Sequence, residues 1–96
     1  MEVIYHPQVH RDVVEVARYY QTISARLANE FEDELRATIA QATDNPLRFP
    51  QTERGFRRAN LKRFPYHVLY EVLPDVIRVM LVRHHKRNPQ FGLDRI

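Results

Sequence analysis

The sequence predicts an α+β domain in which an antiparallel β-sheet packs against an N-terminal α-helical hairpin, with the elements in the order β-α-α-β-β-β. Three observations carry this prediction. Apolar residues recur with the period of an α-helix in two stretches of the first half, and they follow strand patterns in the second half. A Pro-Asp pair between two strand-like runs indicates a hairpin turn. The length of 96 residues suits one domain spanning residues 1–96.

A short strand and a first helix begin the chain. Glu2 to Tyr5 contains β-branched and aromatic residues and ends before Pro7, which suits the first turn of a helix. The spacing of the next apolar residues predicts an amphipathic helix over about residues 7–23. Its apolar face comprises Val9, Val13, Val16, Ala17, Tyr20 and Ile23.

A second helix follows after a short link, so the two helices should form an antiparallel hairpin. Ser24 is a typical N-cap residue and marks its start. Pro46 disfavours helical geometry in the residue before it, which places the end at Asp44–Asn45. The apolar face comprises Ala28, Phe31, Leu35, Thr38, Ile39 and Ala42.

Three strands should follow a loop over residues 46–55, which contains two prolines and a glycine. Phe56 to Phe64 carries many charges, as an exposed edge strand does. From Tyr66 to Leu73, apolar and aromatic residues recur at every second position, which predicts a strand with one apolar face. Val76 to His84 is apolar on both faces, as a central strand should be. A short polar tail follows Pro89.

Composition excludes several classes of function. The chain has no cysteine, so it has neither disulfides nor a thiol nucleophile. The N-terminus lacks the pattern of a signal peptide, and no apolar run reaches the length of a membrane span, so we expect a cytoplasmic protein without a membrane partner. The two glycines, Gly55 and Gly92, do not form a phosphate-binding loop, and the histidine spacing does not complete a metal site. We therefore expect no cofactor and no metal.

Positive charge concentrates in the second half. Residues 1–48 hold five arginines and eight acidic residues, a net charge of −3, whereas residues 49–96 hold ten basic and four acidic residues, a net charge of +6. If these cations lie along one edge of the folded domain, they form a surface that can bind phosphates or an acidic partner. Phe56, Phe64 and Phe91 would then be available for stacking on bases. The alternative is that the aromatic residues fill the core and the charges are solvated. Nine of the ten basic residues are candidates for this surface: Arg54, Arg57, Arg58, Lys62, Arg63, Arg83, Lys86, Arg87 and Arg95.

Two adjacent histidines, His84 and His85, end the predicted central strand. Histidine can transfer protons near neutral pH, and a metal-free ribonuclease would need such groups beside cations that stabilise the phosphate. Successive strand residues point to opposite faces, so these two imidazoles should not share one site. The alternative is that one packs and the other is solvated.

The element order and two sequence stretches resemble the RelE/ParE superfamily of bacterial toxins from type II toxin–antitoxin systems. The stretches are "RFPYHVLYEV" (Arg63 to Val72) and "VIRVMLVRHHKRNP" (Val76 to Pro89). The F-P-Y-x-x-x-Y pattern from Phe64 to Tyr70, the H-x-x-R pair of His84 and Arg87, and the "NPL" of residues 45–47 are similar to the ParE-like, plasmid-stabilisation branch.

The resemblance implies one of two activities. RelE-like members cut messenger RNA on the ribosome, whereas ParE-like members poison DNA gyrase. Arg58 and Arg87 resemble basic positions of the nuclease type, but Asn60 and His67 stand where cations are expected, and no tyrosine follows Arg87. We therefore expect a ParE-like growth inhibitor that acts by binding and not as an enzyme. The alternatives are a ribosome-dependent endoribonuclease and an inactive member that serves only as a binding module.

The resemblance also implies a cognate antitoxin protein, with which the chain would form a hetero-oligomer. The ribonuclease alternative has as its candidate catalytic residues His84, His85, Arg58 and Arg87. The candidate residues for binding the antitoxin or the target are Arg57, Arg58, Lys62, Arg63, Arg83, Lys86 and Arg87.

Overall fold

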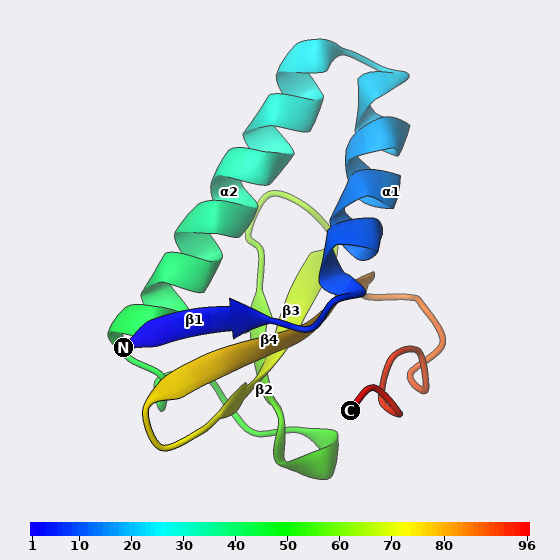
Figure 1. The fold of residues 1–96 in the computed structure, drawn as a ribbon. Coiled ribbons are helices and arrows are strands. Elements are labelled where there is room, and N and C mark those ends of the chain that lie inside the picture. Colours follow the sequence, from blue (N-terminus) through cyan, green and yellow to red (C-terminus); the bar gives the residue numbers. More distant parts are fainter.

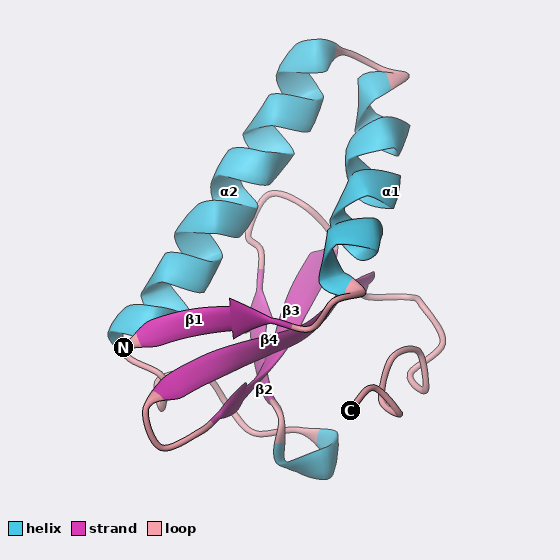
Figure 2. Cartoon of the chain, viewed as in Figure 1, coloured by secondary structure: helices cyan, strands magenta, loops and turns pink.

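The computed structural model describes residues 1–96 and contains the predicted elements in the predicted order. The two helices pack side by side on the same side of the sheet (Figure 1, Figure 2), which confirms the α+β class. The first half consists of β1 (Glu2–Tyr5), α1 (Val9–Gln21) and α2 (Ala25–Asp44). The second half consists of the 3-10 turn η1 (Glu53–Gly55), β2 (Arg57–Asn60), β3 (Tyr66–Val72) and β4 (Val76–His84). Neither α-helix has the length and apolar character needed to cross a bilayer.

The sheet has the strand order β1-β4-β3-β2, so β4 is a central strand as predicted. β3 and β4 form the predicted antiparallel hairpin, and β2 pairs antiparallel with β3. β1 joins the other edge of β4 in parallel, which makes the sheet mixed. The sequence did not predict this parallel pairing, because no local signal identifies the strand that an N-terminal segment will join.

The helix boundaries agree with the sequence to within two residues. α1 begins at Val9 and not at residue 7, because the amide of His6 still donates to the Val79 carbonyl and extends the pairing of β1. α1 ends at Gln21, which leaves Ile23 outside the helix and 60% exposed. Ser24 caps α2 as predicted, since its Oγ accepts a hydrogen bond of 3.0 Å from the Leu27 amide.

The predicted edge strand over residues 56–64 is wrong in length, because only Arg57–Asn60 form β2. The chain then turns toward α2, where the Glu34 carboxylate accepts hydrogen bonds from the backbone amides of Lys62 and Arg63. Leu61 and Phe64 are buried on either side of this turn. A charged turn and a charged edge strand have similar sequences, which is why the prediction continued the strand through Lys62 and Arg63.

Most of the core lies between the helices and the sheet. Phe31 of α2 is fully buried, and its ring lies 5.5 Å from the rings of both Phe64 and Tyr66. Tyr70 is also fully buried, and its hydroxyl donates a hydrogen bond of 2.6 Å to the Pro46 carbonyl. The F-P-Y-x-x-x-Y and "NPL" patterns therefore meet in space, where they pack the helices and the loop after α2 onto the sheet.

The other side of the sheet carries a smaller core under the C-terminal segment. Leu69, which alternates with residues of the main core, packs there with Leu81 and Leu93. A bulge at Met80 changes the register of β4, so that Met80 and Leu81 both belong to this cluster. Gly92 has φ of +76°, and a Cβ atom there would lie 2.7 Å from Leu81 Cδ2. The tail is therefore packed, which corrects the expectation of a merely polar tail.

A buried ion pair completes the edge of β4 beyond the end of β1, which pairs only as far as Val79. Asp12 of α1 accepts a hydrogen bond of 3.1 Å from the Val82 amide, and Arg95 donates one of 2.9 Å to the Met80 carbonyl. The Arg95 guanidinium and the Asp12 carboxylate are joined by two hydrogen bonds of 2.6 and 2.8 Å. Their side chains are only 7% and 5% exposed, so Arg95 is not part of a basic surface.

Removal of the Asp12 carboxylate should destabilise the fold strongly, because it leaves the Arg95 guanidinium buried without a counter-charge. We expect Asp12→Ala to lower the free energy of unfolding by about 3–5 kcal/mol, measured by urea denaturation followed by circular dichroism. Arg11→Ala is the control, since Arg11 pairs with Glu15 on the exposed face of the same helix at 3.6 Å. This control should change the free energy by less than about 1 kcal/mol, and similar losses in the two variants would contradict the role assigned to Asp12.

Candidate functional site

The candidate site lies where β3 begins and β4 ends, because Tyr66 pairs with His84 and His67 pairs with Arg83 there. Side chains on the two faces of the sheet enter different surroundings. Tyr66 and His84 face the helices, and their rings lie 5.0 Å apart. His67 and Arg83 face the other side, which the C-terminal segment and η1 partly cover.

Arg83 organises this second side from a buried position, with its side chain only 5% exposed. It donates a hydrogen bond of 2.9 Å to His67 Nε2 and one of 2.8 Å to the Pro89 carbonyl. It also pairs at 3.1 Å with the Glu53 carboxylate of η1. Arg83 therefore holds a loop and the tail against the sheet, and it does not present its charge to a partner as the sequence suggested.

The hydrogen bonds assign the tautomers of His67 and His85. Arg83 can only donate, so His67 Nε2 accepts and the proton of this imidazole sits on Nδ1. That Nδ1 donates to His85 Nδ1 at 2.9 Å, which leaves the proton of His85 on Nε2. The rings are nearly parallel, with centroids 5.2 Å apart, as expected for two imidazoles that meet nitrogen to nitrogen in one plane. We call His67, His85, Arg83, Arg58 and Glu53 the histidine network.

Both imidazoles of the histidine network are held neutral. Burial, followed by Arg58 and Arg83, lowers the pKa of His67 to about 3. Burial, followed by Arg58 and then His84, lowers the pKa of His85 below its usual value. Arg58 also lies 3.3 Å from His85 Nδ1, where it is a second donor to the same atom. His85 thus presents an Nε2–H donor to solvent, and a neutral imidazole in this tautomer offers no lone pair there to act as a base.

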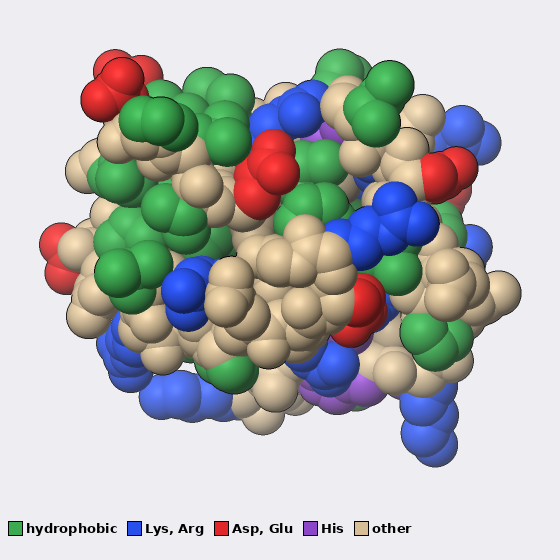
Figure 3. All heavy atoms as spheres, turned by 90° about the horizontal axis from the view of Figure 1, so that it is seen from below, with side chains coloured by type: hydrophobic (Ala, Val, Ile, Leu, Met, Phe, Trp, Pro, Cys, Tyr) green, Lys and Arg blue, Asp and Glu red, His purple; other side chains and the backbone are tan.

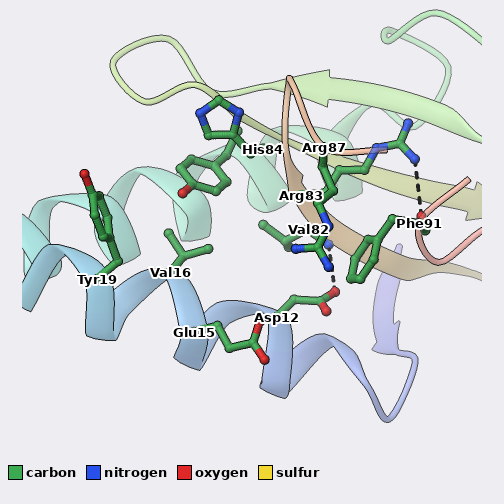
Figure 4. Close-up of a pocket in the computed structure, with 10 residues that line it drawn as sticks. Asp12, Glu15, Val16, Tyr19, Val82, Arg83, His84, Arg87 and Phe91 are labelled. Carbon is green, nitrogen blue, oxygen red and sulfur yellow. Dashed lines mark hydrogen bonds between the residues drawn. The ribbon is translucent and has the colours of Figure 1, made fainter. Parts of the chain in front are cut away.

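His84 packs beside Tyr66 and His85 bonds to His67, so the two side chains join different groups, as the sequence predicted. Their rings still approach each other edge-on, with centroids 6.4 Å apart. Its Nδ1 accepts a hydrogen bond of 3.0 Å from the Lys86 amide. It lines a cavity of about 160 Å³ between α1 and the end of β4, together with Glu15, Tyr19 and Arg87 (Figure 4). Figure 4 shows that these residues come from α1, from β4 and from the segment that follows β4.

The predicted basic residues do not share one border. Arg57 donates to the carbonyl of Phe49 at 2.8 Å, within the loop after α2. Arg63 pairs with Glu30 of α2 at 2.7 Å. On the face seen in Figure 3, the Lys and Arg side chains are interspersed with acidic and uncharged surface. The side chains of Arg57, Arg63 and Arg83 bind acidic groups or backbone carbonyls. The side chains of the other four predicted binding residues do not, and these are Arg58, Lys62, Lys86 and Arg87.

The structure also decides between stacking and packing for the aromatic residues. Phe56 and Phe64 are 7% and 5% exposed and belong to the two cores, so they cannot stack on bases. Phe91 is half-buried, and the Arg87 guanidinium lies over its ring, with 4.2 Å between the guanidinium carbon Cζ and the ring centroid. The sequence did not mark Tyr19 or Glu53 as site residues, because nothing near them in the chain signals that α1 and η1 approach the end of β4.

Comparison with a solved structure shows which known fold the chain shares. The fold superposes with a TM-score of 0.77 on a chain of the "Chromosomal ParDE TA system from P. aeruginosa", covering 88% of this chain and 95% of that one. The sequence identity is 15%, so this likeness concerns the fold alone.

Sequence comparison then identifies the family. Residues 3–89 match the family described as "ParE toxin of type II toxin-antitoxin system, parDE". "Toxin ParE2" of Mycobacterium tuberculosis, in strain CDC 1551 / Oshkosh and in strain ATCC 25618 / H37Rv, is 32% identical over 88 residues, which cover 88% of this chain and 81% of the relative. The chain belongs to the ParE toxin family of type II toxin–antitoxin systems, which confirms the resemblance seen in its sequence.

The neutral state of His67 should make stability depend on pH. The pKa of His67 is about 3 in the folded protein and about 6.5 in the unfolded chain. The unfolded chain therefore binds the proton first as the pH falls, so the stabilisation is complete above pH 6.5 and is lost progressively toward pH 3. Between pH 6.5 and pH 4, we expect His67 to add a slope approaching about 1.4 kcal/mol per pH unit to the free energy of unfolding.

Urea denaturation at pH values from 7 to 4 measures this slope. His67→Gln should have the smaller slope, even if it is less stable at pH 7. The exposed His10 provides the control, and His10→Gln should keep the slope of the unaltered protein. An unchanged slope in His67→Gln would show that His67 is not held neutral by the fold.

Proposed function

We propose that this chain is a cytoplasmic growth-inhibiting toxin that binds and poisons DNA gyrase and is neutralised by a cognate antitoxin protein. Membership of the ParE family supports this proposal. The observation that carries the mode of action is the state of the histidines. His84 and His85 both use Nδ1 as a hydrogen-bond acceptor, and the pKa of His85 is lowered.

Phosphodiester cleavage without a metal needs a base for the ribose hydroxyl and an acid for the leaving oxygen. His85 is unsuited to both tasks, because its Nε2 is already protonated and its neutral ring is a weak acid. His84 is in the same tautomer when neutral, because its Nδ1 accepts from the Lys86 amide. The cations next to His85, Arg58 and Lys86, bind anions but do not exchange protons near neutral pH. This set of groups favours an inhibitor that acts by binding.

A supercoiling assay with purified gyrase tests the target. The unaltered toxin at stoichiometric excess should reduce supercoiling and accumulate cleaved DNA. Arg58→Ala combined with Lys86→Ala should raise the toxin concentration for half-inhibition by about tenfold, because the two changes remove the half-buried Arg58 of the histidine network and the exposed Lys86 that follows His85. Arg18→Ala, an exposed arginine of α1, is the control and should not change it. Normal supercoiling at excess toxin would exclude gyrase as the target.

A ribosome-dependent endoribonuclease is the alternative function. One observation favours it, since the fold brings Arg58 to within 3.3 Å of His85, two of the four residues named for that chemistry. The other two, His84 and Arg87, lie on the cavity beside α1. Primer extension on messenger RNA after induced expression distinguishes the two functions, because a nuclease leaves discrete cuts and a gyrase poison does not.

The same assay identifies the cutting residues if cuts are found. Loss of the cuts in His85→Ala but not in His10→Ala would favour the nuclease and would contradict the tautomer argument. A third outcome, normal growth at high expression without the antitoxin, would indicate an inactive member that acts only as a binding module. Growth with and without co-expression of the cognate antitoxin completes this test.

A further inference from the structure

A groove runs along α1 where this helix faces the C-terminal segment. Two adjoining cavities of about 160 and 220 Å³ form it, and they share Asp12, Glu15, Arg87 and Phe91. Tyr19 lies at one end and Gln8 at the other. We call these six residues, with the space between them, the α1–tail groove. Figure 4 shows the part between Tyr19 and Phe91.

Arg87 is the free charge of the α1–tail groove. Its guanidinium lies over the Phe91 ring, which restrains it, and no carboxylate lies within 4.0 Å of it. The two acidic residues of the groove already have partners. Asp12 is bound by Arg95, and Glu15 lies 3.6 Å from Arg11. The groove therefore offers one unpaired guanidinium beside two pairs that are complete.

The cavity next to Arg87 has a polar part, lined by Asp12, Glu15, Arg83 and His84, and an apolar part, which we call the hollow. Its walls are Val16 and Tyr19 of α1, with Tyr66 and Val82 of the sheet. The Tyr19 side chain is 59% exposed. Tyrosine and arginine are the residue types that contribute most often to the binding energy of protein interfaces. Here both types line a concave surface of a size that suits a single large side chain.

We propose that the α1–tail groove is a docking site for an acidic segment of a partner protein, the antitoxin, with one carboxylate on Arg87 and an adjacent apolar side chain in the hollow beside Tyr19. A planar guanidinium binds a carboxylate through two parallel hydrogen bonds. The hollow removes apolar surface of the partner from water, which adds affinity that charge alone does not provide. This inference rests on the proposed neutralisation by an antitoxin and names where that antitoxin binds.

The charges of the groove favour a protein segment over a nucleic acid. A nucleic-acid strand brings a phosphate with every nucleotide, and its affinity depends on several cations along its path. Of the cations that line the groove, Arg95 is paired with Asp12 and Arg11 with Glu15, so a phosphate chain would find only one free guanidinium along its path. A protein segment can place a single carboxylate opposite Arg87 and uncharged atoms elsewhere.

Isothermal titration calorimetry of the toxin with its cognate antitoxin, sought as a small acidic protein encoded next to the toxin gene, tests this site. Arg87→Glu and Tyr19→Ala should each weaken binding by at least about tenfold. The matched controls are Arg36→Glu and Tyr5→Ala, an exposed arginine and an exposed tyrosine on the groove between α1 and α2. They should leave the dissociation constant within about twofold of that of the unaltered toxin.

Charge rescue separates a direct contact from a general effect. Each Asp and Glu of the antitoxin is changed to Lys in turn, and one of these variants should restore binding to Arg87→Glu while it weakens binding to the unaltered toxin. Circular dichroism melting confirms that the toxin variants fold.

Three results would overturn the inference. The first is unchanged antitoxin binding by Arg87→Glu and Tyr19→Ala, which would leave the proposed function standing. The second is the absence of any rescuing charge. The third is a loss of DNA or RNA binding by Arg87→Glu while the antitoxin affinity is retained. Failure of the unaltered toxin to bind its neighbouring protein at all would instead count against the proposed neutralisation, and the docking site would fall with it.

Discussion

The buried pair of Asp12 and Arg95 is the interaction that joins the parts of this protein. It connects α1, the unpaired edge of β4 and the C-terminal segment through one set of hydrogen bonds. Taking two charges out of water costs several kcal/mol per ion, and the attraction between them offsets this only when their remaining hydrogen bonds are satisfied. Here each partner also binds a backbone group of β4. The Asp12–Arg95 pair consequently also fixes the positions of α1 and the C-terminal segment, which form the two sides of the α1–tail groove.

Arg83 illustrates how the position of a charged residue determines its role. It is a cation in a basic stretch, yet it is buried and bonded to His67, to Glu53 and to the backbone of the tail. Its charge holds two imidazoles in fixed tautomers and does not extend the basic surface. As a result, His85 uses its Nδ1 as an acceptor within the network and presents its Nε2–H as a donor to solvent. The surface cations that remain are fewer and more dispersed than the composition suggests.

The sequence predicted those parts of the structure that depend on neighbours in the chain. Periodicity identified both helices, Ser24 identified a boundary, and alternation identified the hairpin of β3 and β4. The predicted separation of His84 and His85 also followed from strand geometry. Contacts between distant residues were not predictable, as in the pair of Asp12 and Arg95, which are 83 positions apart. The role of Arg83 and the path of the tail depend on such contacts. The sequence therefore predicted which residue types the site contains but not how they are arranged in space.

The central place of β4 has a consequence for the order of events during synthesis. β1 emerges first from the ribosome, but its only partner in the sheet is a strand that begins at Val76. Domains are made from the N-terminus onward, and pairing across a long loop is slow. The helical hairpin can form early. The complete sheet, the histidine network and the ion pair of Arg95 with Asp12 can form only after almost all of these residues have left the exit tunnel. The parallel pair of β1 and β4 can therefore form only late in synthesis, after the helical hairpin that separates the two strands in the chain.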